Sequence, residues 1–150
     1  MPVNAGGDLL RLGGRDRGAR VKAFTGTWVN KIDAKGRISV PASFRTVLQE
    51  KGLAGVALYP SLLDPCIEGC GMDRIEALVA GQPDLPLPSV QDDDVTHLII
   101  GAARDIPFDG GGRIVLPEDF MAQAKLTDKG AFVGKGRSFQ IWEPGADRKS

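Results

Sequence analysis

The fold of this chain is decided by a twelve-residue motif, DAKGRISVPASF at residues 33–44, which is repeated as DGGGRIVLPEDF at residues 109–120. Both copies fit the pattern Asp-x-x-Gly-Arg-Ile-x-x-Pro-x-x-Phe, with six identical positions in twelve and an offset of 76 residues. A repeated unit that cannot bury its own apolar face needs its copy to do so. The sequence therefore predicts two related units that share one core.

Each copy of this line indicates a turn, a short strand and then a helix. Aspartate accepts hydrogen bonds from nearby backbone amides and glycine tolerates positive φ, which are the properties of a tight hairpin connection. Proline lacks a ladder donor and fits the first turn of a helix, so it ends each strand and opens each helix. The expected turn-forming residues are Asp33, Gly36, Asp109 and Gly112.

The same order of elements is predicted around both copies. Apolar spacing indicates strands before and after each turn, then a helix, then two further strands at 55–60 and 65–70 in the first copy and 130–134 and 138–142 in the second. Between the copies, residues 72–80 have helical spacing, and Ser89 is expected to cap a second linker helix.

The predicted fold class is α+β, with two tandem units and a helical connector. The expected ranges are a flexible arm at 1–23, the first unit at 24–70, the connector at 71–100, the second unit at 101–143 and a tail at 144–150. A lone hairpin is marginal in water, so the two copies should pair and close a common core. That pairing places Arg37 and Arg113 at equivalent positions about a pseudo-twofold axis.

Charge is unevenly distributed along a chain whose formal net charge is zero. Residues 1–70 carry ten basic and six acidic side chains, residues 71–97 one and six, and residues 98–150 eight and seven. A basic first unit and an acidic connector therefore underlie the neutral total. Five cations of the arm could reach a phosphate backbone, although an unstructured extension or a misplaced start codon explains the arm equally well: Arg11, Arg15, Arg17, Arg20 and Lys22.

Several classes of protein are disfavoured by the sequence. No apolar run approaches the roughly 18 residues of a membrane helix, so a cytoplasmic protein is expected. Cys66 and Cys70, without partnering histidines, fit neither a zinc site nor a disulfide framework, and no metal or other cofactor is expected. Residues 92–94 are expected to form the acidic first turn of a helix, and His97 is expected to pack beside Leu98. No activated nucleophile or acid–base pair is evident, which argues against an enzyme.

The two Asp-x-x-Gly-Arg motifs, each followed by an apolar strand and proline, resemble the MraZ family of bacterial regulators with tandem SpoVT-AbrB-type units. The helical connector and the terminal SFQIW agree, and the resemblance covers about residues 24–143. It implies a swapped-hairpin barrel within one chain, a ring-shaped homo-oligomer, and transcription regulation by binding short direct repeats of double-stranded DNA before the cell division and cell-wall gene cluster. It also implies association with the nucleoid, with no membrane or small-molecule partner. A ring-forming assembly protein, or an AbrB-like antitoxin-type regulator with a different operator, remains an alternative.

The resemblance assigns DNA contact to Arg37 and Arg113, with Lys31 and Arg45 flanking the same surface. Lys35 lies in the first turn, whereas the second copy adds only the more distant Arg104. The first copy is therefore expected to contribute more to DNA binding. The alternative is that the two motif arginines merely pair with the aspartates of their turns.

In the ring, five apolar residues would be shared between core and interface: Leu98, Ile99, Phe139, Ile141 and Trp142.

Overall fold

The computed structural model describes residues 23–81 and 93–146. The first copy contains β2 (Thr27–Lys31), β3 (Arg37–Ser39), α1 (Ala42–Glu50), β4 (Gly55–Pro60) and β5 (Ile67–Cys70). The connector contains α2 (Met72–Val79) and α3 (Asp93–Ala102). The second copy contains β6 (Arg104–Pro107), β7 (Arg113–Val115), α4 (Glu118–Gln123), β8 (Lys129–Gly134) and β9 (Phe139–Trp142). The α+β class is confirmed, while Ser89 and the five arm cations lie outside the described residues.

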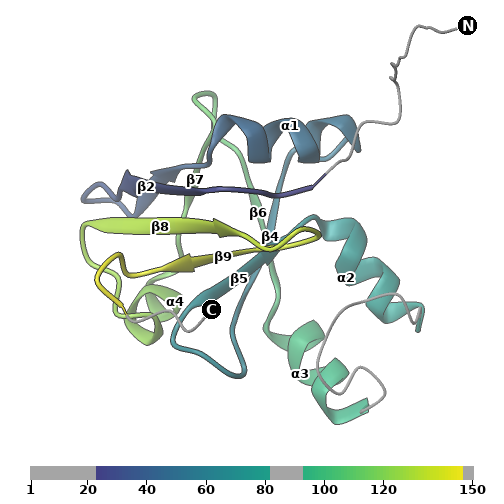
Figure 1. Cartoon of the computed structure of the whole chain (residues 1–150). Helices are drawn as coiled ribbons and strands as arrows, with labels where there is room; N and C mark the ends of the chain where they lie inside the picture. Colours follow the sequence, from purple (N-terminus) through teal and green to yellow (C-terminus); the bar gives the residue numbers. More distant parts are fainter. Residues whose placement is uncertain (1–22, 82–92, 147–150) are drawn as a thin grey trace, which may run out of the picture.

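The main sheet is built from strands of both copies in the order β2-β8-β9-β5-β4-β6. Strand β2 of the first copy pairs antiparallel with β8 of the second, and the two lie side by side in Figure 1. In return, β6 of the second copy pairs with β4 of the first. At the centre, β5 and β9 join the two copies, with Glu68 opposite Gln140 and a 3.0 Å hydrogen bond from the amide to the carboxylate. Each copy therefore completes its sheet with strands of the other.

The second sheet is a two-stranded ribbon of β3 and β7, hereafter the ribbon. Ile38 lies opposite Ile114 at its centre, with Arg37 opposite Val115 and Ser39 opposite Arg113. Two matching backbone hydrogen bonds frame it: the amide of Val40 donates to the Gly112 carbonyl at 3.2 Å, and the amide of Leu116 donates to the Gly36 carbonyl at 2.8 Å. Because each bond maps onto the other through the 76-residue offset, the ribbon carries the pseudo-twofold axis.

Two sequence expectations about strand pairing need correction. Strands β2 and β3 were expected to form a hairpin, but they meet only at an isolated bridge between Ile32 and Ile38, because β2 pairs along its length with β8. The strands also do not close into a barrel within the described residues, since β2 and β6 end the six-stranded sheet and the ribbon remains separate. The turns form as expected, while the strands on either side of each turn pair with strands of the other copy: β2 with β8, β3 with β7, and β6 with β4.

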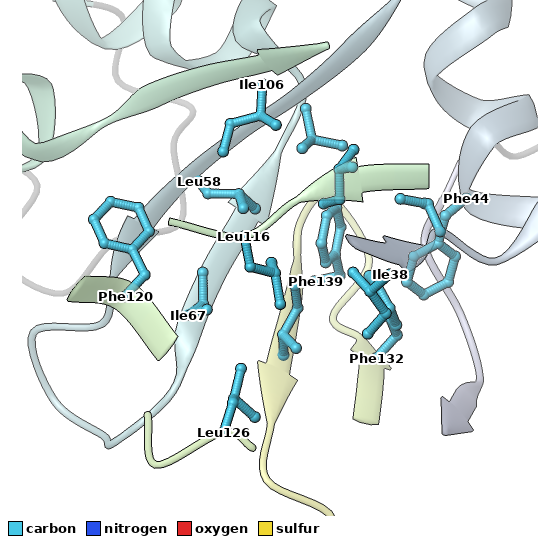
Figure 2. Packing of buried hydrophobic residues seen from close by; sticks show 14 of the residues in the cluster. Ile38, Phe44, Leu58, Ile67, Ile106, Leu116, Phe120, Leu126, Phe132 and Phe139 are labelled. Carbon is cyan, nitrogen blue, oxygen red and sulfur yellow. The ribbon is translucent and has the colours of Figure 1, made fainter. Parts of the chain in front are cut away.

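One hydrophobic core is shared by both copies, as the repeat requires. Figure 2 shows Ile38 and Phe44 of the first copy beside Phe132 and Phe139 of the second. The Phe44 ring lies 5.3 Å from Phe139 and 6.1 Å from Phe132, between centroids. Neither copy could bury these aromatic side chains alone, so the shared core stabilises the exchanged sheet.

Helix α1 carries the apolar side chains Phe44, Val47 and Leu48 on its buried face. Pro41 precedes its first residue, and Gly52, with a φ of 76°, follows its last turn as expected of a glycine at a helix end. The connector helices pack on each other through a smaller cluster that includes Ile75 and Ile99.

The residues expected to be shared between the core and a subunit interface are mostly buried, and α3 exposes two neighbouring side chains. Leu98 is 59% exposed and His97 is also exposed, so the packing expected of His97 beside Leu98 does not bury the histidine. Four of the five residues proposed to be shared with a subunit interface are already buried within the chain: Ile99, Phe139, Ile141 and Trp142. Only Leu98 of that set remains available to a partner.

Candidate nucleic-acid interface

The first turn, residues 33–36, is held by the side chain of Asp33. Its Oδ1 accepts hydrogen bonds from the backbone amides of Lys35 and Arg37, both at 2.9 Å. The Gly36 amide donates to the Asp33 carbonyl at 3.0 Å, and Gly36 has a φ of 81°. The backbone hydrogen bond from Arg37 is the main cause that lowers the pKa of Asp33, so the carboxylate stays ionised.

The second turn, residues 109–112, repeats this geometry. Asp109 Oδ1 accepts from the amides of Gly111 at 2.8 Å and Arg113 at 2.9 Å, and Gly112 has a φ of 77°. The pKa of Asp109 is lowered, first by the backbone hydrogen bond from Arg113. Both turns thus end in an arginine whose backbone is tied to the turn's own aspartate.

Each motif arginine also pairs with its turn aspartate through the side chain. Arg37 Nε lies 2.7 Å from Asp33 Oδ2, and Arg113 Nε lies 3.0 Å from Asp109 Oδ2. Arg113 Nη1 is 3.9 Å from Asp33 Oδ2, which brings the two turns together. The ion pairs of the alternative interpretation therefore exist, but exposed pairs of this kind contribute little stability.

These ion pairs orient the arginines and leave part of each guanidinium for a ligand. The carboxylates engage the Nε atoms, and within the described residues the Nη groups of Arg37 make no hydrogen bond. The side chains of Arg37 and Arg113 are 33% and 39% exposed. Both occupy the outer face of the ribbon, because Ile38 and Ile114 between them point into the core and are 1% exposed. The arrangement presents two oriented cations on one surface.

The first turn is surrounded by lysines from both copies. Lys35 is exposed within the turn, and Lys31 is exposed at the end of β2 just before it. Lys31 lies directly opposite Lys129 of β8, which is also exposed. Sequence reasoning missed Lys129, because it lies outside the motif and only the exchange of strands brings it to this place. Like charges directly opposite one another are destabilising. An anion bound between Lys31 and Lys129 would reduce this repulsion, so the pair is suited to binding an anion.

Arg45 does not flank its own turn but lies over the turn of the other copy. A Cβ atom placed on Gly112 would collide with the Arg45 guanidinium, so any other residue there would displace that side chain. Met121 is the equivalent residue of the second copy, and its Sδ would be 3.9 Å from a Cβ placed on Gly36. Each helix therefore places a side chain against the turn of the other copy, and the second turn gains a cation that the sequence order assigned to the first.

Arg104 lies apart from the ribbon. Its guanidinium makes two hydrogen bonds to Asp119, at 3.2 and 2.8 Å, and its Cζ lies 4.7 Å from the centroid of the Phe120 ring. Both partners belong to α4. Of the six predicted DNA contacts, four lie in, directly after or against the two turns: Lys35, Arg37, Arg45 and Arg113. Lys31 ends β2 two residues before the first turn, and the Arg104 side chain lies against α4.

The remaining chemically active side chains make no second site in the described residues. Cys66 and Cys70 are buried free thiols, and burial raises the pKa of each to about 12. Residues 23–81 and 93–146 contain no group of three or more His, Cys, Asp or Glu side chains placed to hold a metal ion. No helix in these ranges is long and apolar enough to cross a bilayer.

Comparison with known proteins places the chain in a family. A family model described as "MraZ protein, putative antitoxin-like" matches residues 99–146. The proteins named Transcriptional regulator MraZ are 45% identical over 130 residues in Rhodospirillum rubrum, 40% over 124 in Rickettsia akari and 44% over 126 in Pelagibacter ubique. These alignments cover 85%, 83% and 84% of this chain and 84%, 83% and 81% of the three relatives. With such identity over most of its length, the chain belongs to the MraZ family.

Proposed function

We propose that this chain is a sequence-specific DNA-binding transcriptional regulator, and that the ribbon with its two turns is the DNA-contacting surface. The observation that carries the proposal is the presence of Arg37 and Arg113 at equivalent positions on one exposed face. Relatives at 40–45% identity are named transcriptional regulators, which supports the same class of function here. The role is one of binding, with no catalytic step.

The dimensions and charge of this surface suit duplex DNA. The major groove admits a two-stranded β-ribbon, and arginine is the side chain most often used there to contact guanine. Lysines at the rim of such a ribbon neutralise phosphates and release counterions, which provides affinity without sequence information. Lys31, Lys35 and Lys129 would take this part on the first turn, and Arg45 on the second.

The finer proposal is a ring-shaped homo-oligomer that binds several short direct repeats upstream of the division and cell-wall gene cluster, in the nucleoid region of the cytoplasm. Several ribbons on adjoining repeats gain effective concentration, so one weak contact per repeat suffices. The exposed edge strand β2 supports self-association, since Trp28 and Val29 remain 39% and 54% exposed on it. Unpaired strand edges with apolar side chains readily pair with another chain.

The test is a mobility-shift titration on double-stranded DNA from upstream of the protein's own gene. We expect retention of this DNA over a shuffled duplex of equal length, tighter binding to several repeats than to one, and a steep loss of affinity as salt rises. Absence of a shift at low salt would overturn DNA binding. Equal affinity for one and several repeats, or a monomer in light scattering at micromolar concentration, would instead remove the ring.

A further inference from the structure

Four side chains lie on the outer face of the ribbon, and two of them are arginines. Side chains directly opposite one another in an antiparallel pair lie on the same face, so Arg37 and Val115 share this face with Ser39 and Arg113. Val115 lies between the two arginines and is 52% exposed, which is unusual for an apolar side chain. Ser39 is exposed as well. Neither side chain is needed for the core, since the opposite face of the ribbon supplies Ile38 and Ile114.

Ser39 and Val115 occupy the same position in the two copies. They are related by the 76-residue offset, as Arg37 is to Arg113. The pseudo-twofold axis therefore relates Arg37 to Arg113, and it relates Ser39 to Val115. The cationic contacts are symmetric about the axis, while these two side chains are not.

We propose that Ser39 and Val115 are specificity-determining residues that contact base edges, and that their difference makes the preferred DNA site asymmetric. The inference rests on the proposed function and concerns the same surface. In the major groove, an apolar side chain contacts the methyl group of thymine, whereas a serine hydroxyl can donate to or accept from several bases. Val115 selects thymine in its half of the site, and Ser39 makes a less restrictive contact in the other half.

This assignment explains why a ribbon built within one chain need not read a palindrome. A symmetric dimer presents identical side chains to both halves of its site, so its operator mirrors the twofold axis. Here both strands come from one chain, and β3 and β7 can differ at any position. An asymmetric site has a direction, which is the property that short DNA elements need in order to be arranged as direct rather than inverted repeats.

The experiment is selection from a randomised double-stranded DNA library with the full chain and three variants. Val115→Ser gives both copies a serine at this position, and Ser39→Val gives both a valine. The control, Val79→Ser, removes a valine of α2 that is 64% exposed, against 52% for Val115. We expect Val115→Ser to lose preference for thymine at one position by roughly fivefold or more and to select a more palindromic site. Ser39→Val should gain a thymine preference in the other half.

The outcomes separate this inference from the proposed function. The salt dependence of binding should be unchanged in both ribbon variants, because no phosphate contact is removed. If the unaltered chain selects a defined sequence and Val115→Ser selects the same one, the inference is wrong and the function stands. A palindromic site for the unaltered chain would also contradict the inference. If the unaltered chain selects no sequence, sequence-specific binding itself is wrong. Circular dichroism of each variant, compared with Val79→Ser, verifies folding.

Discussion

The guanidinium of Arg45, on helix α1 of the first copy, lies against the backbone of Gly112 in the turn of the second copy. This contact joins a helix and a turn that the sequence places in different units. A substitution at Gly112, in the turn of the second copy, would therefore move the Arg45 guanidinium of the first copy. The DNA-contacting surface is therefore one composite structure rather than two independent motifs.

Replacing Gly112 with alanine should disturb this contact. The positive φ alone costs about 1–2 kcal/mol for a residue with a Cβ, and the added methyl group also displaces Arg45. Gly52→Ala is the matched control, because Gly52 has a φ of 76° and nothing lies within 4 Å of an added Cβ. Urea unfolding should show the greater loss for Gly112→Ala, and only this variant should bind DNA more weakly. Equal behaviour of the two variants would exclude a role for the Arg45 contact.

The two motif arginines should differ in their contribution to DNA binding. Arg37→Ala should weaken binding by about 1–3 kcal/mol and Arg113→Ala by less, because more lysines surround the first turn than the second. Arg45 reduces the difference by providing charge at the second turn. Titration of both variants on one multi-repeat duplex measures this order. A larger effect of Arg113→Ala would make the second turn dominant.

Lys129→Ala should change stability and DNA binding in opposite directions. Removing one of two directly opposed lysines should stabilise the pairing of β2 with β8 by about 0.2–1 kcal/mol. The same change removes a phosphate contact and should reduce the slope of log affinity against log salt by about 0.9. Arg74→Ala removes one cation from α2 and serves as the control, with little effect on binding. Unaltered affinity of Lys129→Ala would place DNA away from the end of β2.

The turns should lose their stabilising carboxylates in acid. The pKa values of Asp33 and Asp109 are lower in the folded chain than the ordinary value of 3.8. Ionised carboxylates therefore stabilise the fold above that pH, and this contribution disappears as the pH falls through the folded-state pKa. Asp33→Asn should show a smaller drop in thermal midpoint between neutral pH and about pH 3 than the unaltered chain. Asp105→Asn, on the exposed side of β6, should keep the full drop.

The elements of the fold were largely predictable from local sequence, because turn chemistry and apolar spacing act over a few residues. Strand β4 coincides with the predicted residues 55–60, and α1 begins directly after Pro41. The partner of β2 was not predictable, since pairing is decided by which copy offers an open edge and a matching apolar face. Lys129 and the true place of Arg45 were missed for the same reason.

The burial of single side chains was only partly predictable. The shared core was predictable from the apolar residues of the repeat, because the same positions in both copies face inward. The exposure of His97 and Leu98 was not foreseen, since α3 covers the sheet with only one side and the spacing did not indicate which side. The motif arginines and their possible pairing with the turn aspartates were both identified from the sequence, while the approach of Arg113 to Asp33 of the other turn became evident only from the structure.

The position of β9 in the middle of the sheet has a consequence for biosynthesis. A ribosome completes β5 and β4 early and β9 last among the strands, yet β9 lies between β8 and β5. Without β9, the strand order divides into β2–β8 and β5–β4–β6, each with an open edge where β9 lies in the complete chain. Chains that stop before Phe139 would therefore leave two strand edges unpaired, and we expect them to aggregate more readily than the complete chain.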